Sequence, residues 1–439
     1  MKYNPYPKYK DSGVEWLGEI PEEWNTLRIG FFYSRTKETD RADMQLLSVY
    51  RDYGVIPKDS RDDNHNNASE DLSTYQVVRE GDLVINKMKA WQGSLGISVH
   101  EGIVSPAYFV LRPVTEYTKS YQKQFFHYLL RSQIYFAEYE KRSKGIRINQ
   151  WDLPYEEFKT ISVLLPNVAT QRAIAAFLDA ETARIDGLIK DYEDLIELLK
   201  EKRQTLISHA VTRGLSELVS PDDTEFGEWA KPVRFKDSGV EWIGEIPEGW
   251  DIRKMKYLCD ISTGSKDTVD ACEDGIFPFF VRSQTIERID TFSQDCEGIL
   301  TAGDGAGVGK VFHHYTGKFD FHQRVYLMYN FRDIYPRFFF HYLNVLFSKV
   351  ALDGGAKSTV DSLRRPVFSE FFLTVTSIYE QKAIANFVDR KSNSIDMLIR
   401  ETESAIELLK EHRSALITNA VTGKINVEAH VAVQTRGKT

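Results

Sequence analysis

Polar and cationic side chains gather on pairs of predicted loops, one loop of each pair in each half of the chain. The first pair is KAWQGSLGIS (89–98) and DGAGVGKV (304–311), where glycines let the backbone approach another surface closely. Phosphates and base edges are bound by cationic and amide side chains on exposed loops. Around this pair the candidates are Lys87, Lys89, Trp91, Gln92, Ser94, Lys310, His313 and His314. A plain β-turn with solvated polar residues is the alternative interpretation.

Two further loop pairs carry the same kinds of side chain. In the second pair, Arg51 and Arg282 could bond a guanine through two hydrogen bonds, and Gln284, next to Ser283, could pair with an adenine. The third pair follows the two FFHYL sequences, and phosphate or base contacts are equally expected there. Its candidates are Lys144, Arg147, Asn149, Lys357, Ser358 and Arg364. For each single residue a simple surface role is the competing interpretation.

The sequence contains no self-contained active site. The stretch from Gly303 to Lys310 resembles a phosphate loop, but Asp304 and Val311 break the required pattern. No HExxH motif is present, the Asn4-Pro5-Tyr6 sequence lacks the order of a methyltransferase motif, and no nuclease motif is complete. We therefore expect no catalytic residue and no metal site on this chain.

Composition indicates a soluble globular protein with reduced cysteines. Apolar residues make up 42% of the 439 positions, and no apolar run approaches the length of a membrane span. The three cysteines lack zinc spacing, and MKYNPYPKYK is no secretory signal, so we expect a cytoplasmic protein. The net charge of −8 argues against general polyanion binding but leaves room for a local basic face.

The loops must be positioned by a duplicated framework. Residues 171–212 and 381–422 repeat each other, and both carry apolar residues at helical spacing. Helices of this length cannot bury such a stripe alone, so we predict that the two pack antiparallel. The predicted packing residues are Ile185, Leu188, Ile189, Tyr192, Leu195, Ile196, Leu199, Leu206, Ile395, Leu398, Ile399, Ile406, Leu409 and Leu416.

A second repeat precedes each variable region. Residues 9–24 (YKDSGVEWLGEIPEEW) and 235–250 (FKDSGVEWIGEIPEGW), here called the opening segments, match at almost every position, and we expect their tryptophans to pack. The variable regions contain short β-branched and aromatic runs and one predicted helix each, 123–136 and 336–347. The sequence thus predicts an α+β protein with two mixed domains of mostly antiparallel sheet, two long antiparallel helices between them, and an internal pseudo-two-fold repeat.

The predicted boundaries follow from these repeats. They are 1–165 for the first opening segment and domain, 166–212 for the first long helix, 213–234 for a linker, 235–375 for the second opening segment and domain, 376–425 for the second long helix, and 426–439 for a polar, fraying tail.

These repeats resemble the specificity subunits of Type I restriction–modification systems. The residues that carry the resemblance are the opening segments, the helix starts QRAIA (171–175) and QKAIA (381–385), and the helix ends ELLKEKRQTLISHAVT (197–212) and ELLKEHRSALITNAVT (407–422). The resemblance implies two target-recognition domains, each reading one half of a bipartite site in double-stranded DNA. It does not transfer individual base-contacting residues, because these domains differ between members.

The resemblance also implies partners. Two methyltransferase subunits would bind the helical regions and carry S-adenosylmethionine, and two restriction subunits, where present, would use ATP and Mg. The chain itself would hold no cofactor, perform no catalysis and contact no membrane. A non-DNA coiled-coil scaffold and a fused nuclease or methyltransferase are the two alternatives.

Overall fold

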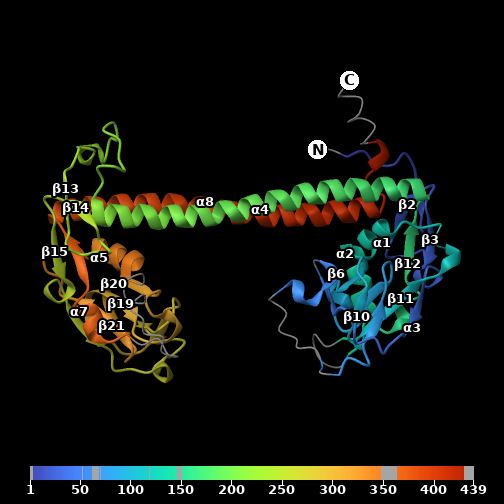
Figure 1. The fold of residues 1–439 in the computed structure, drawn as a ribbon, viewed down its shortest axis with the longest axis horizontal. Coiled ribbons are helices and arrows are strands. Elements are labelled where there is room, and N and C mark those ends of the chain that lie inside the picture. Colours follow the sequence, from blue (N-terminus) through green and yellow to red (C-terminus); the bar gives the residue numbers. More distant parts are fainter. Residues whose placement is uncertain are drawn as a thin grey trace. The chain divides into compact units, whose positions relative to one another are not determined.

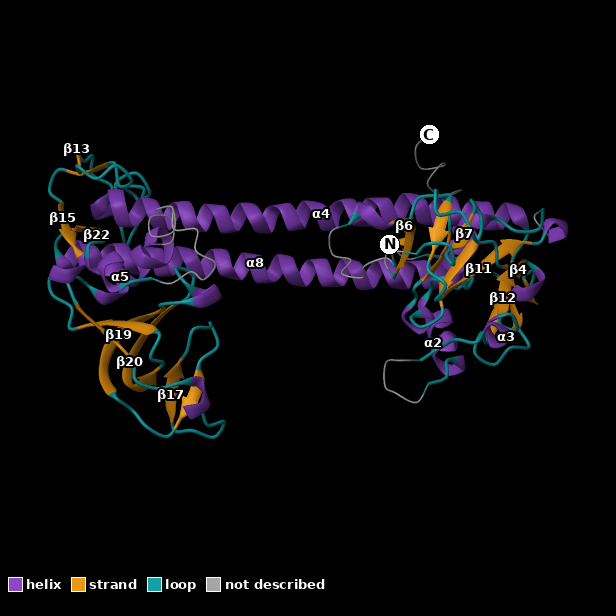
Figure 2. Cartoon of the chain, turned by 60° about the horizontal axis from the view of Figure 1, so that its bottom comes forward, coloured by secondary structure: helices purple, strands orange, loops and turns teal. Residues whose placement is uncertain are grey.

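The computed structural model describes residues 3–51, 53–61, 69, 71–117, 119–145, 151–347 and 363–429. Contacts divide the chain into a first unit, Met1–Asp191 with Ser404–Thr439, and a second unit, Tyr192–Glu403. Both boundaries fall inside the two longest helices, α4 (Val168–Arg213) and α8 (Ile378–Val421). Each unit therefore contains a segment of both helices, and Figures 1 and 2 show these segments side by side.

The α4 and α8 segments are joined by apolar packing and by one ion pair in each unit. In the first unit Ile185 shares a core with Leu416, and Arg413 Nε bonds Asp186 Oδ1 at 2.8 Å. In the second unit Arg203 pairs with Asp396. The two ion pairs use the same two positions of the repeat, so the duplicated sequence supplies complementary charges on antiparallel helices. The predicted helix pair and fold class are confirmed.

The predicted packing residues divide into three groups by exposure. Five are buried, namely Ile185, Ile196, Ile395, Ile406 and Leu416. Seven are partly buried, namely Leu188, Ile189, Tyr192, Leu199, Leu206, Ile399 and Leu409. Leu195 and Leu398 are 40% and 49% exposed, so their assignment to the packed stripe was wrong. A stripe between two helices is narrower than the apolar face that the sequence suggests.

The first unit contains a four-stranded antiparallel sheet of order β4-β11-β8-β9 and several two-stranded pairs. Its strands are β1 (Tyr9–Asp11), β2 (Glu19–Pro21), β3 (Asn25–Arg28), β4 (Tyr33–Thr36), β5 (Leu47–Tyr50), β6 (Gly54–Pro57), β7 (Gln76–Val78), β8 (Leu83–Asn86), β9 (Leu95–Ile97), β10 (Gly102–Val104), β11 (Tyr108–Pro113) and β12 (Ser162–Leu165). The predicted single helix 123–136 is two helices, α1 (Lys123–Leu130) and α2 (Gln133–Arg142), and α3 (Tyr155–Phe158) follows.

The second unit contains a six-stranded sheet of order β16-β21-β19-β20-β17-β18, in which only the β17–β20 pair is parallel among the residues described. Its strands are β13 (Phe235–Asp237), β14 (Glu245–Pro247), β15 (Asp251–Lys254), β16 (Asp260–Thr263), β17 (Phe277–Phe280), β18 (Glu287–Ile289), β19 (Gln294–Ala302), β20 (Phe312–Phe321), β21 (Val325–Tyr329) and β22 (Phe372–Val375). Helix α5 (Pro336–Tyr342) continues into a π-helical turn (Leu343–Phe347), and α7 (Arg365–Ser369) precedes β22.

A buried glutamine ties each domain to its long helix. Gln171 Oε1 accepts the backbone N–H of Gln122 at 2.7 Å, and Gln171 Nε2 donates to the carbonyls of Ser120 and Pro166. In the second unit Gln381 bonds the N–H of Tyr335 in the same way. Both glutamines are fully buried. The repeated Gln at the start of each long helix is therefore explained by its three hydrogen bonds.

These bonds also correct the alignment of the two FFHYL sequences. About two turns further along each long helix, Asp179 accepts from Tyr128 at 2.7 Å, and Asp389 bonds His341 at 2.9 Å. His341 thus occupies the position of Tyr128. A direct alignment of the two FFHYL sequences would pair His341 with His127, which is one residue out of register. The duplication extends into the domains, but the shared FFHYL does not give its register.

Segments predicted as linker and tail belong to the cores of the units. Phe226, in the predicted linker, is 3% exposed and meets Phe387 edge-on at 5.4 Å. Val427, in the predicted fraying tail, is 1% exposed, and the N–H of Asn426 donates to the carbonyl of Asn4 at 2.7 Å. Both ends of the chain thus contribute packing to the first unit.

The opening segments pack as expected and complete these cores. Trp24 and Trp250 are each 2% exposed, and Trp16 meets Tyr135 edge-on at 5.0 Å. The hydroxyl of Tyr9 donates to the carbonyl of Gly423 at 2.9 Å, so the first opening segment binds the end of the last helix.

Candidate nucleic-acid interface

The first unit brings two predicted loops together. The loop between β8 and β9 lies against the segment that follows α2, because the N–H of Leu153 donates to the carbonyl of Lys87 at 3.0 Å. The rings of Trp91 and Trp151 meet at 5.0 Å between centroids. We call Lys87, Lys89, Trp91, Gln92, Lys144 and Trp151 the first loop surface. Sequence reasoning missed Trp151, although an aromatic residue beside a polar loop was an available signal.

The charges of this surface are only partly neutralised. Lys87 Nζ lies 3.6 Å from Asp152, and Lys144 Nζ lies 2.9 Å from Glu157 while its side chain remains 71% exposed. Lys89 is exposed, and its ammonium group has no hydrogen-bond or ion-pair partner among the described residues. The surface thus presents cations beside two aromatic rings, which is the combination that binds phosphates and stacked bases.

Ser94 does not belong to this surface. Ser94 is only 5% exposed, because the turn at Gly93 folds it under the loop. A Cβ on Gly93 would lie 2.3 Å from Phe136, so only glycine permits this close packing. The prediction that Ser94 contacts DNA is contradicted by its burial. Arg147 and Asn149 lie outside the described residues.

Arg51 lies at the tip of the β5–β6 hairpin beside groups that the sequence did not single out. Its carbonyl accepts a bond from Arg131, whose Nη1 lies 2.7 Å from His127 Nε2. Tyr53, next to it, is 54% exposed. Arg131 and Tyr53 were missed because nothing in the sequence places α1 beside this hairpin.

His127 makes the stability of the first unit depend on pH. Burial of the imidazole and the charge of Arg131 lower the pKa of His127 to about 3. The unfolded chain binds this proton near pH 6.5, so stability is full above that pH and falls as pH drops toward 3, by up to about 1.4 kcal/mol per pH unit. We expect His127→Gln to flatten this slope in denaturant titrations between pH 4 and 7. The same exchange at the exposed His412 is the control, and an unchanged slope in His127→Gln would contradict the assignment.

The second unit brings its two predicted loops together more completely. Gln284 Nε2 donates to the carbonyl of Lys310 at 3.3 Å, and His313 Nε2 donates to the carbonyl of Ser283 at 3.0 Å. Burial lowers the pKa of His313, partly offset by that hydrogen bond. We call Arg282, Ser283, Gln284, Lys310 and His313, with Arg324 added below, the second loop surface.

Asp304 connects this surface to an arginine that sequence reasoning missed. Its carboxylate bonds Arg282 Nη1 at 2.9 Å and also bonds Arg324. Burial raises the pKa of Asp304, but the hydrogen bonds from Arg324 and Arg282 outweigh it and hold the pKa below its usual value. The glycine-rich stretch after Asp304 packs on the other loop, since a Cβ on Gly307 would lie 2.3 Å from the carbonyl oxygen of Arg282. Gly307 therefore serves the close packing of the two loops.

The remaining predicted residues of the second unit lie elsewhere or outside the described residues. His314 points to the opposite face of β20 from His313, where it bonds Glu297 at 2.9 Å and stacks on Phe340. Alternation along a strand separates the two histidines, so His314 does not join the second loop surface. Arg364 is exposed at the start of α7. Lys357 and Ser358 lie outside the described residues.

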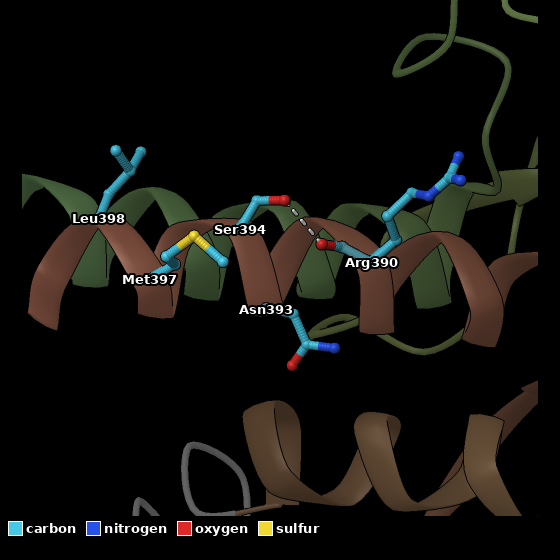
Figure 3. Close-up of a pocket in the computed structure, with 5 residues that line it drawn as sticks. All are labelled: Arg390, Asn393, Ser394, Met397 and Leu398. Atoms are coloured by element: carbon cyan, nitrogen blue, oxygen red, sulfur yellow. Dashed lines mark hydrogen bonds between the residues drawn. The ribbon is translucent and has the colours of Figure 1, made fainter. Parts of the chain in front are cut away.

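A shallow groove lies on α8, lined by Arg390, Asn393, Ser394, Met397 and Leu398 (Figure 3). Met397 and Leu398 are 55% and 49% exposed. Arg390 pairs with Glu225, and Ser394 Oγ donates to the carbonyl of Arg390 at 3.0 Å. The groove therefore combines two exposed apolar side chains with a polar edge.

Metal-binding clusters and membrane-spanning helices are both absent from the part of the chain that the structure describes. No group of three or more His, Cys, Asp or Glu side chains there could hold a metal ion. None of the helices there is both long and apolar enough to cross a membrane.

The chain contains two mixed α+β domains. Each domain has a surface of cations, amides or aromatic rings, and each is built on segments of a long helix pair. This is the architecture of a duplicated recognition protein. The family model "Type I restriction modification DNA specificity domain" matches residues 247–408. The specificity subunit of the Type I restriction enzyme MjaVIII of Methanocaldococcus jannaschii is 23% identical over 93% of this chain and 94% of its own length. These matches support the resemblance to Type I restriction–modification specificity subunits that the repeats indicated.

Other comparisons agree with the resemblance to Type I specificity subunits. The EcoDI specificity subunit of Escherichia coli is 28% identical, but the match spans 42% of this chain and only 40% of that protein. A solved structure on complex assembly and conformational transition of the type I R-M system contains a chain with the same fold. The TM-score is 0.69 at 16% identity, and the match covers 92% of this chain and 99% of that chain. The HsdS subunit of Thermoanaerobacter tengcongensis gives a TM-score of 0.51 at 15% identity, with coverage of 92% and 98%.

Proposed function

We propose that this chain is the sequence-reading subunit of a Type I restriction–modification complex and that each domain reads one half of a bipartite site in double-stranded DNA. The observation that carries the proposal is the pair of loop surfaces, each assembled from loops that are distant in sequence. Phosphate contacts would set the register, and a few side chains would read bases. The chain itself performs no bond chemistry and holds no cofactor.

The partners supply the chemistry in this proposal. Two methyltransferase subunits hold S-adenosylmethionine and methylate an adenine that is flipped out of the duplex. Two restriction subunits, where the system has them, use ATP and Mg. The comparisons do not favour the scaffold or fused-enzyme alternatives.

Genome-wide mapping of methylated adenines, with and without this gene, tests the proposal. We expect one bipartite motif to lose its methylation when the gene is absent. Purified complex should bind that motif, with an affinity that falls steeply as salt rises. Methylation that is unchanged without the gene would refute the proposed function.

The helix pair is proposed to set the distance between the two half-sites. Removing residues 193–199 from α4 and 400–406 from α8 keeps the facing positions of the two ion pairs in step. Seven residues shorten each helix by about 10 Å, so we expect a preferred spacer about 3 base pairs shorter when sites are selected from random DNA. An unchanged spacer would contradict this role.

The groove on α8 is proposed as part of a methyltransferase docking surface. We expect the double variant Met397→Glu, Leu398→Glu to weaken capture of the methyltransferase subunit by about tenfold or more, because charge replaces apolar area that an interface core would bury. Val269→Glu, at a position that is 88% exposed outside the long helices, is the control. Equal capture by all three proteins in pull-down titrations would exclude this groove from the docking surface.

A further inference from the structure

One buried carboxylate holds two arginines in the second loop surface. Asp304 follows β19 and is 7% exposed. Its Oδ1 accepts from Arg282, which follows β17, and its Oδ2 accepts from Arg324, which lies in the turn between β20 and β21. Three separate turns of the sheet that contains β19, β20 and β21 in Figure 1 are therefore joined at one carboxyl group.

The charge of this cluster is not balanced. One carboxylate neutralises one of the two guanidinium groups, so the cluster retains a net positive charge. The side chains of Arg282 and Arg324 remain 39% and 60% exposed. Each arginine bonds Asp304 through its Nη1, and the Nε and Nη2 donors of both have no partner within the described residues. Those two donors form the edge that binds two acceptors at once.

The surroundings hold the cluster in place. Gly307 lies against the Arg282 carbonyl, and Gln284 and His313 bond across the same two loops. An arginine that is already held by a carboxylate loses less conformational entropy when it binds than a free surface arginine loses.

We propose that Arg282 and Arg324 read guanine in the half-site of the second domain and that Asp304 is the residue that positions them. Guanine presents two acceptors, O6 and N7, on its major-groove edge, and a guanidinium edge matches both. This inference rests on the proposed function. It identifies which arginines give the second domain its base preference, and it adds Arg324 and Asp304 to the residues that sequence reasoning selected.

The test uses the complex with methyltransferase subunits and measures methylation of a random duplex library by sequencing. We expect Arg324→Gln and Arg282→Gln each to lose about 10- to 100-fold of the preference for guanine at positions in one half-site, while the other half-site stays unchanged. Asp304→Asn should weaken the same positions less, because an amide has one acceptor oxygen for two arginines. Arg332→Gln, which removes an exposed arginine paired with Asp260, should change no base preference.

Each outcome distinguishes the inference from its alternatives. A half-site without guanine, or unchanged preference in both arginine variants, would overturn the proposal. Weaker binding to all sequences, with a salt dependence reduced by about one charge, would mean that the arginines contact phosphates instead. If the unmodified complex shows no sequence preference at all, the proposed function itself fails. Since Arg282 and Arg324 are partly exposed, their variants test the proposal even if Asp304→Asn does not fold.

Discussion

Replacing Ile185 with glutamate destabilises the first unit by on the order of 4 kcal/mol. Ile185 of α4 is fully buried, and it lies in the same apolar core as Leu416 of α8. A glutamate there would place a carboxylate in an apolar core without a cation to pair with, and this is one of the few ways in which a single substitution causes so large a loss. Denaturant unfolding, followed by circular dichroism, measures the change as a lower transition midpoint.

The control for this prediction is Leu195→Glu. The same sequence pattern places both residues in the packed stripe, but the structure leaves Leu195 40% exposed. We expect its substitution to change stability by about 0.5 kcal/mol or less. Equal destabilisation by the two variants would mean that exposure in this structure does not describe the packing of α4.

Replacing Gln171 with leucine should cost about 2–4 kcal/mol, although leucine is of similar size. The variant leaves the N–H of Gln122 and the carbonyls of Ser120 and Pro166 buried without their partner. Unmade bonds to buried backbone groups cost more than a hydrogen bond contributes when it forms. We expect a lower unfolding midpoint and faster hydrogen exchange at the Gln122 amide.

Two variants control for this effect. Gln204→Leu, at an exposed position of the same helix, should leave the midpoint nearly unchanged. Gln381→Leu should destabilise the second unit to a similar degree, because Gln381 bonds Tyr335, Asp333 and Thr376 in the same arrangement. The double variant should show the sum of the two losses, since the two glutamines share no partner. A loss from Gln171→Leu no larger than that from Gln204→Leu would refute the role of this glutamine.

The candidate DNA-contacting residues show how far loop composition can be interpreted. Composition drew attention to the two hairpin loops, because glycines between strand ends and polar residues are visible in one sequence. It did not separate Ser94, which is buried, from Lys89, which is exposed. Arg324 escaped notice because it lies in a short turn far along the chain from Arg282. Two contacts connect it to the loop surface, its bond to Asp304 and the bond from the Gly303 N–H to its carbonyl.

The sequence by itself determined the duplication, the two long helices and their complementary charges, because each of these depends on residues at fixed intervals along the chain. The repeated opening segments and helix ends also carried the resemblance to Type I restriction–modification specificity subunits. Only the tertiary structure decided which helix segments share a unit, which of the apolar residues meet, and which arginines share one carboxylate. It also placed Asn426 and Val427, which follow α8, against the first domain. Such contacts join residues from 20 positions apart, as for Arg324 and Asp304, to 414 apart, as for Tyr9 and Gly423. Nothing local in the sequence encodes the geometry by which they meet.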